Sequence, residues 1–337
     1  MRISYRTRQF YRRLFLMLIS IALAALTLLL CWVLWLRRYI VYTPDGVRLD
    51  FSLSQKWPQG ITGQEHISVI PPNIYYDEDE EILPPEEEES RFEGFYVTVD
   101  ELLDNLDGTL EKILKLPEGT PIMVDVKGHW GYFYYPTTAG CGTSGSFDMA
   151  TMDAFFKAVN EAGLYTIARL PAFRDYAFAA ENNSSGLKVQ AGYLWVDPDR
   201  VYWLDPMDDA VLTYLIQISK ELESMGFDEV AFSYFCFPDT NQVVYSTDRD
   251  VAVAKAAQTL VTTCANDSFT VSFISTDSAF PLPAGNCRLY LTDVAAYDVQ
   301  DVLSLMQKDV AERVVFFTNS NDTRYQQCGV IRPLYMA

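Results

Sequence analysis

The feature that most constrains the fold is a regular alternation of short apolar segments and longer amphipathic ones between residues 95 and 318. Short apolar runs rich in β-branched and aromatic residues indicate buried strands, and helical periodicity in the longer segments indicates helices between them. Strands separated by helices pair in parallel, because a parallel connection needs about a dozen residues or more. We therefore predict an α/β fold, a TIM-type (β/α) barrel.

The predicted strands cover residues 95–99, 121–127, 165–170, 229–235, 269–274, 288–292 and 313–318, and the predicted helices cover residues 100–116, 148–162, 207–225, 248–264 and 299–311. One weaker strand is predicted near residues 328–332, with no closing helix after it. The pattern leaves open whether the barrel closes or is incomplete and distorted at its C-terminal end.

An almost unbroken apolar run, Leu14–Leu36, lies ahead of this domain. As a helix it is long enough to cross the roughly 30 Å hydrocarbon layer of a membrane. It is too long for a cleaved signal peptide, so we predict an uncleaved, single-pass signal anchor in the cell membrane. Arginines are more numerous before the run than after it, which places the N-terminus in the cytoplasm and the rest of the chain outside.

Composition divides the chain into five predicted parts. They are a basic cytoplasmic tail (1–13), the transmembrane anchor (14–36), a stalk or small β segment (37–70), an acidic Pro/Glu-rich linker (71–90) and the barrel (91–337). The linker should be extended, because its like charges repel and its prolines stiffen it. The formal net charge of -19 argues against a nucleic-acid partner, since phosphate contact requires a basic face.

Residue counts argue against several cofactor classes. The 6 cysteines show no CxxC pair, and 2 histidines are too few for a histidine-rich zinc site. No phosphate-cradling glycine loop is present. We therefore predict no cofactor and no metal, and leave two alternatives open for the cysteines outside the anchor: buried free thiols, or one disulfide involving Cys264 or Cys287.

One segment, GFDEVAFSYFCFPDT at residues 226–240, resembles a strand of the bacterial "putative glycoside hydrolase" domain family, relatives of the α-amylase-type barrels. The family's version reads Phe-Asp-Tyr-Val-Arg-Phe-Pro. The residues that match are Phe232, Tyr234, Phe237 and Pro238. Ser233 stands where the family has a carboxylate, and Cys236 stands where it has an arginine.

Three further segments carry the same resemblance in the same order, at residues 121–136, 162–175 and 202–206. The first retains Asp125 and Lys127 of the family's Val-Ile-Asp-Val-Lys-Asp-Asp run, and Gly128 replaces the next acid. The resemblance covers residues 92–238. It implies a barrel that acts on or binds polysaccharide, and that lacks its carboxylate at the fourth strand.

A glycosidase needs two carboxylates that flank the scissile bond. The candidate catalytic residues are Asp125, Asp205 and Asp293, with Asp277 as a further acid that follows a predicted strand. Alternatives stay open for each of them. Asp125 could belong to a structural ion pair with Lys127 or Arg169, Asp205 could cap the next helix, and aspartates after strands often form turns.

The loop at residues 129–147 is long and rich in aromatic residues and glycine, and it follows a strand on the face where barrels bind ligands. Aromatic rings there either stack on sugars or pack over the barrel rim. The predicted substrate-binding residues are Lys127, Trp130, Tyr132, Tyr134, Arg169, Trp195, Ser233 and Tyr234. A Ser233, His129 and Asp125 triad is disfavoured, because no G-x-S-x-G elbow surrounds the serine.

Taken together, these patterns predict a membrane-anchored, extracytoplasmic, glycoside-hydrolase-like protein. We expect it to be catalytically impaired, a pseudoenzyme that binds cell-envelope or environmental polysaccharide. Two alternatives stay open: an active glycosidase that uses Asp125 with a second carboxylate (Asp205, Asp277 or Asp293), and a structural envelope protein. A protein partner at the membrane is compatible with each of them.

Overall fold

The computed structural model of the chain describes residues 40–43, 46–49 and 92–336. The chain divides into two compact units, Met1–Ile82 and Leu83–Ala337. In the first unit, β1 (Ile40–Thr43) and β2 (Gly46–Leu49) pair in antiparallel orientation. This pair lies within residues 37–70, where the sequence predicts a stalk or small β segment.

The predicted anchor, residues 14–36, and the predicted acidic linker, residues 71–90, lie outside the described residues. Among the residues that the structure describes, no helix combines the length and apolar character needed to cross a bilayer. The membrane anchor and the extracytoplasmic location therefore stay predictions.

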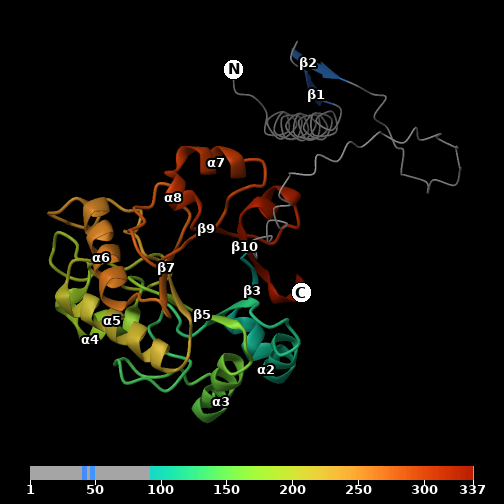
Figure 1. Cartoon of the computed structure of the whole chain (residues 1–337). Helices are drawn as coiled ribbons and strands as arrows, with labels where there is room; N and C mark the ends of the chain where they lie inside the picture. Colours follow the sequence, from blue (N-terminus) through green and yellow to red (C-terminus); the bar gives the residue numbers. More distant parts are fainter. Residues whose placement is uncertain (1–39, 44–45, 50–91, 337) are drawn as a thin grey trace, which may run out of the picture. The chain divides into compact units, whose positions relative to one another are not determined.

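The second unit is a closed barrel of eight parallel strands (Figure 1). The strands are β3 (Glu93–Val97), β4 (Pro121–Asp125), β5 (Tyr165–Pro171), β6 (Glu229–Ser233), β7 (Thr270–Ser275), β8 (Leu289–Leu291), β9 (Val314–Phe317) and β10 (Gly329–Pro333). Closure comes from β10, which pairs with β9 on one side and with β3 on the other. The weak strand predicted near residues 328–332 is therefore the one that completes the ring, and the barrel is not open.

Helices surround the strands on the outside (Figure 1). They are α2 (Val99–Ile113), α3 (Met149–Asn160), α4 (Tyr176–Glu181), α5 (Asp209–Ser224), α6 (Arg249–Cys264), α7 (Val299–Leu305) and α8 (Lys308–Ala311). The single helix predicted over residues 299–311 is wrong, because the chain breaks it into α7 and α8. Between β7 and β8 the described chain has no helix, so the ring of helices is less regular than the ring of strands.

Side-chain caps fix where the long helices begin. Thr98 and Glu101 form a capping box at α2, and Asp148, Asp208 and Asp248 each accept a backbone N–H in the first turn of α3, α5 and α6. The interpretation of Asp205 as the cap of α5 is wrong, since Asp208 holds that position. Thr98 follows β3 directly, whereas the caps of α3 and α6 end the loops that follow β4 and β6.

The barrel interior is filled by side chains from six strands, namely Met123, Ile167, Ala231, Tyr290, Val315 and Ile331. Alternate residues of a strand face the same side. Asp125 and Arg169 lie two residues beyond Met123 and Ile167, so both face the interior at the C-terminal end of the barrel. At the opposite end, the fully buried Glu229 accepts hydrogen bonds from Tyr165 and Tyr290, each at 2.9 Å, and pairs with Arg288.

The cysteines of the described residues are all free: Cys141, Cys236, Cys264, Cys287 and Cys328. Three of them, Cys141, Cys264 and Cys287, are buried. Of the two alternatives that the sequence left open, the structure has free thiols at Cys264 and Cys287.

Candidate functional site

A cleft of about 1630 Å³ opens at the C-terminal ends of the barrel strands. Its floor includes Asp125, Arg169, Ser233 and Ser275, which lie at or near the ends of β4, β5, β6 and β7. The loops that follow these strands form its walls. This end of a parallel barrel is where TIM-barrel enzymes bind their substrates.

The structure brings most of the predicted site residues together in this cleft. The predicted residues that line it are Asp125, Lys127, Trp130, Tyr132, Tyr134, Arg169, Trp195, Ser233, Tyr234 and Asp277. Two predicted catalytic acids, Asp205 and Asp293, are not among the lining residues. Asp205 accepts hydrogen bonds from the Met207 N–H and the Tyr245 hydroxyl, and Asp293 is exposed after β8.

Asp125 is tied to Arg169 by a bidentate ion pair. The Arg169 Nε lies 2.6 Å from Asp125 Oδ1, and Arg169 Nη2 lies 2.9 Å from Oδ2. Asp125 Oδ2 also accepts the Val99 N–H at 3.0 Å, at the start of α2. The guanidinium lies over the rings of Tyr96 and Phe317, so the pair is fixed from several sides.

Lys127 pairs with a different carboxylate. Its Nζ lies 2.6 Å from Asp175 Oδ2, and neither side chain is exposed to solvent. The ammonium also donates to the Pro171 carbonyl and lies over the rings of Phe133 and Tyr214. Because its charge is compensated below the cleft surface, Lys127 acts here as a structural cation of the loop after β4.

Arg174, which the sequence did not single out, organises one wall of the cleft. It donates to Asp197 at 2.7 Å and to Asp199 at 2.6 Å. Asp197 is buried, and it also accepts the Val201 N–H and the Trp203 indole N–H. Burial favours the protonated acid, but the hydrogen bonds from Arg174, Val201 and Trp203 outweigh it and lower the pKa of Asp197 below its usual value.

Tyr234 lies on this same wall, directly after β6. Its φ of 51° is in the left-handed region that non-glycine residues seldom adopt. The Arg174 guanidinium lies 5.1 Å from the centre of the Tyr234 ring, and Trp203 meets that ring edge-on at 6.0 Å. Tyr234 is thus held in place although 43% of it is exposed to the cleft.

Three aromatic side chains are accessible in the cleft: Trp130, Tyr132 and Tyr234 are 42%, 45% and 43% exposed. Two other predicted aromatic residues are buried in the wall. Trp195 donates its indole N–H to Gln242 at 3.1 Å, and Tyr134 packs against Phe147. Burial, with a smaller contribution from the nearby Asp125, raises the pKa of Tyr134 to about 12, so its hydroxyl stays protonated at neutral pH.

Other polar groups of the cleft differ in whether they have a hydrogen-bond partner. Asp277 accepts the Ala279 N–H in its own loop, whereas the exposed Asp239 and the Ser233 hydroxyl have no hydrogen-bond partner among the described residues. Burial and the neighbouring Arg174 lower the pKa of His129 below its usual value, so this imidazole is neutral at neutral pH. No group of three or more metal-binding side chains occurs in the described part of the chain.

A signal for the missed Arg174 wall was present in the sequence. Residues 195–198 read Trp-Val-Asp-Pro, the string that the resemblance assigns instead to residues 202–206. The first copy carries the cleft carboxylate Asp197, and the second carries Asp205. The resemblance at residues 202–206 therefore points to Asp205, whereas the cleft carboxylate belongs to residues 195–198.

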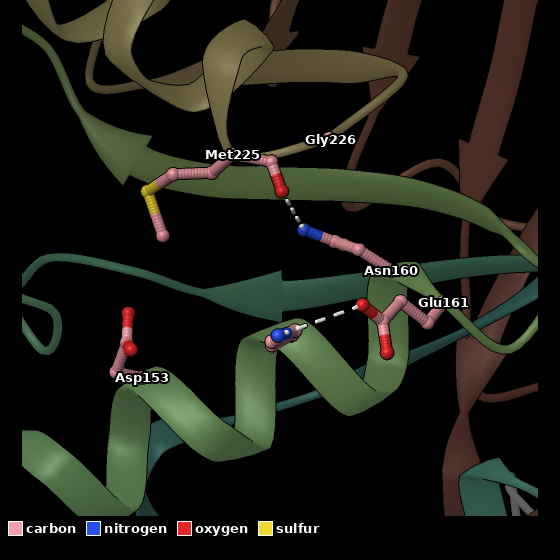
Figure 2. Close-up of a pocket in the computed structure, with 6 residues that line it drawn as sticks. Asp153, Asn160, Glu161, Met225 and Gly226 are labelled. Carbon is pink, nitrogen blue, oxygen red and sulfur yellow. Dashed lines mark hydrogen bonds and ion pairs between the residues drawn. The ribbon is translucent and has the colours of Figure 1, made fainter.

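A second, smaller hollow of about 330 Å³ lies between the C-terminal end of α3 and the turn after α5 (Figure 2). There the Asn160 side-chain N–H donates to the Met225 carbonyl at 2.9 Å, while Asn160 Oδ1 is buried without a partner. None of the predicted site residues lines this hollow. It belongs to the outer helical layer and not to the barrel mouth.

The fold is similar to those of several solved structures. An inactive mutant of the GH20 exo-β-N-acetylglucosaminidase from Vibrio harveyi matches with a TM-score of 0.52 at 6% identity, over 72% of this chain and 49% of that one. A hypothetical protein from Ruminiclostridium thermocellum matches at 21% identity and a TM-score of 0.44, over 53% of this chain and 96% of that one. The α-galactosidase from Thermus thermophilus matches at 14% identity and a TM-score of 0.40, over 54% of this chain and 37% of that one.

These identities establish likeness of fold alone. The chain spans about half of the acetylglucosaminidase and less of the galactosidase. No curated protein matches the chain. Residues 94–274, however, match the family DUF4015, described as "Putative glycosyl hydrolase domain", which covers more than half of the sequence and includes the cleft from Asp125 to Ile274. The chain therefore belongs to the "Putative glycosyl hydrolase domain" family.

Proposed function

We propose that the barrel binds a glycan in the cleft at its C-terminal end and that its hydrolytic chemistry is impaired. The observation that carries the proposal is the state of Asp125. Within the eight described barrel strands it is the one carboxylate at a C-terminal strand end, and Arg169 and Val99 already engage both of its oxygens. At the end of β6, where the resemblance implies a carboxylate, the chain has Ser233.

Glycoside hydrolysis requires two free carboxyl groups, about 5 to 10 Å apart, to transfer a proton and to attack or stabilise the anomeric carbon. A carboxylate that accepts two guanidinium hydrogen bonds and one amide hydrogen bond is a weak nucleophile. A serine hydroxyl at Ser233 supplies neither the negative charge nor the acidity.

The binding surface remains although the chemistry is weakened. A volume of about 1630 Å³ exceeds that of common small-molecule pockets, roughly 300 to 1,000 Å³, and is large enough for more than one sugar ring. Trp130, Tyr132 and Tyr234 are accessible in this cleft, and aromatic rings can pack against the C–H surfaces of sugars. These features support a site for an oligosaccharide segment.

A second candidate, an active hydrolase, is favoured by one observation. Asp239 lies in the cleft with no partner among the described residues, and Asp277 lies there as well. Asp239 could serve as one member of a carboxyl pair, with Asp277 or Asp125 as the other. In this candidate the chain keeps hydrolytic activity with acids displaced from the strand ends into the loops.

Measurements of glycan binding and of glycan hydrolysis distinguish the binding protein from the active hydrolase. The purified protein is applied to a glycan array and is also assayed for release of reducing ends from the glycans that it binds. Binding that falls at least about tenfold on Trp130→Ala, without measurable release, supports the proposal. The matched control is Tyr297→Ala, which removes an exposed aromatic side chain that is not among the cleft residues.

Release of reducing ends that is lost on Asp239→Asn or Asp277→Asn would replace the proposal with the hydrolase. Neither binding nor release from any glycan would contradict both candidates and favour the structural envelope protein.

We also propose that residues 14–36 anchor the protein in the cell membrane with the barrel outside. The support is the length of the apolar run and the excess of arginines before it. The full chain should be found in the membrane fraction, and external protease should cleave it in intact spheroplasts. A chain that lacks residues 1–38 should lose membrane association, and recovery of the full chain in the soluble fraction would contradict the anchor.

A further inference from the structure

The basic groups that line the cleft are all engaged by carboxylates. Lys127 is paired with Asp175 beneath the surface, and Arg169 is held by Asp125. The third, Arg174, is shared between Asp197 and Asp199. Among the lining residues, no lysine or arginine therefore remains to bind an anionic group of a ligand.

Carboxylates, in contrast, outnumber the cations. Five aspartates line the cleft against three basic residues. Asp199 is 73% exposed and shares its arginine with Asp197. Asp239 and Asp277 are exposed and make no ion pair with a described residue. Arg249, at the start of α6, does not neutralise them, because it donates to the carbonyls of Thr240 and Val243. The cleft therefore carries an excess of negative charge.

The accessible aromatic rings add to this preference. Trp130 and Tyr132 expose their side chains in the same cleft, whereas the Tyr234 ring already holds the Arg174 guanidinium. The face of an aromatic ring attracts ammonium and guanidinium groups and repels anions. Because unpaired carboxylates and ring faces favour the same kind of ligand, the whole lining is suited to a sugar that carries an amine.

We propose that the cleft selects glycans by charge: it binds sugars that carry a free, protonated amine, such as glucosamine units of a deacetylated polymer, and rejects sugars that carry carboxylate, sulfate or phosphate. This inference rests on the proposed function and adds the class of glycan. An anionic sugar would have to displace an aspartate from each cation, and displacing Asp175 or Asp197 would leave a buried charge unpaired. An amine-bearing sugar meets exposed carboxylates that no cation neutralises.

Three oligosaccharides of equal length test the preference with the purified full-length chain. They are an oligomer of glucosamine, the same oligomer after complete N-acetylation, and an oligomer of galacturonic acid. Affinities are measured by titration calorimetry at mildly acidic pH, where the amines are protonated, and at low and high salt. We expect the glucosamine oligomer to bind tightest, with an affinity that falls as salt rises, because screening weakens exposed charge pairs.

The double variant Asp239→Asn with Asp277→Asn tests which groups provide the charge. It should weaken glucosamine binding by about tenfold, since exposed ion pairs each contribute up to a few-fold in affinity, and leave binding of the acetylated oligomer unchanged. The control is Asp267→Asn, which removes an exposed carboxylate ahead of β7, at the opposite end of the barrel. Asparagine matches aspartate in shape, and circular dichroism verifies that each variant is folded.

The outcomes distinguish this inference from the proposed function. Tighter binding of the galacturonate or the acetylated oligomer, equal binding of all three, or a double variant that binds glucosamine like the Asp267 control would overturn the charge selection and leave glycan binding intact. Failure to bind any of the three oligomers, together with a blank glycan array, would overturn the proposed function and this inference with it.

Discussion

Tyr234 combines an unfavourable backbone conformation with a position in the cleft. Non-glycine residues at positive φ cost roughly 1 to 2 kcal/mol, and such strain persists where the surrounding structure enforces it. Here Arg174 and Trp203 hold the ring from one side, and β6 fixes the chain just before it. The strain is the local cost of directing an aromatic ring into the cleft at a strand end.

Replacing Tyr234 by glycine and by alanine tests this strain. Both variants lose the ring, but only alanine keeps the penalty for positive φ, so Tyr234→Gly should be more stable than Tyr234→Ala by about 1 kcal/mol. The same pair at Tyr132, which is not among the residues with positive φ, should show the reverse order. Urea denaturation measures both differences, and an alanine variant as stable as the glycine variant at position 234 would show that the backbone there is unstrained.

Asp197 should make stability depend on pH in the acidic range. Its pKa in the folded protein lies below the ordinary value of 3.8, so the unfolded chain binds a proton more readily. The stabilisation is therefore complete above the ordinary value and is lost as pH falls through the pKa of the folded state. Between about pH 5 and pH 2, the free energy of unfolding should fall more steeply for the wild type than for Asp197→Asn, and parallel profiles would rule out this contribution.

At the scale of single residues, the sequence predicts which residues line the cleft better than it predicts which residues they pair with. A position near the C-terminal end of a predicted strand, together with the family resemblance, was enough to find Asp125, Trp130 and Ser233. The pairing of Lys127 with Asp175 depends on the path of the loop after β5, and no local pattern specifies that path. The absence of Asp205 and Asp293 from the lining has the same cause. The resemblance at residues 202–206 pointed to Asp205, and a position after the predicted strand 288–292 pointed to Asp293, but neither reports where the loop turns.

The strands themselves were predictable because each is a short apolar run bounded by polar or turn-forming residues. The prediction 121–127 corresponds to β4 at Pro121–Asp125, and 229–235 corresponds to β6 at Glu229–Ser233. The short helix α4 was missed, because its six residues are too few to show helical periodicity. Closure by β10 is not predictable from local sequence, because its pairing with β3 joins the two ends of the domain.

Gly94 in β3 is required by the close approach of the next strand. A Cβ atom at this position would lie 2.6 Å from the Cβ of Pro121, the first residue of β4. Gly94→Ala should therefore lower the free energy of unfolding by about 1 to 3 kcal/mol, because backbone must shift to relieve the contact. Gly145→Ala, where nothing lies within 4 Å, is the matched control and should change stability by less than about 0.5 kcal/mol. Equal urea midpoints for the two variants would contradict this account.

For the whole molecule, the unit Leu83–Ala337 contains all eight barrel strands. A chain that begins at Leu83 should fold on its own and unfold in one cooperative transition, with a midpoint close to that of the full chain. Removing residues 329–336 from this shorter chain should abolish the transition, since β3 and β9 would then present open edges. A broad, non-cooperative melt of the chain from Leu83 would show that the first unit contributes to the barrel.

Closure by β10 also sets the order in which the protein can mature during synthesis. The strand that seals the ring leaves the ribosome after the seven others, and its partner β3 is the first to emerge. Until then, β3 and the newest strand each offer unpaired backbone groups to other nascent chains. Conditions that keep those edges from pairing with other chains until β10 is in place should therefore raise the yield of folded protein.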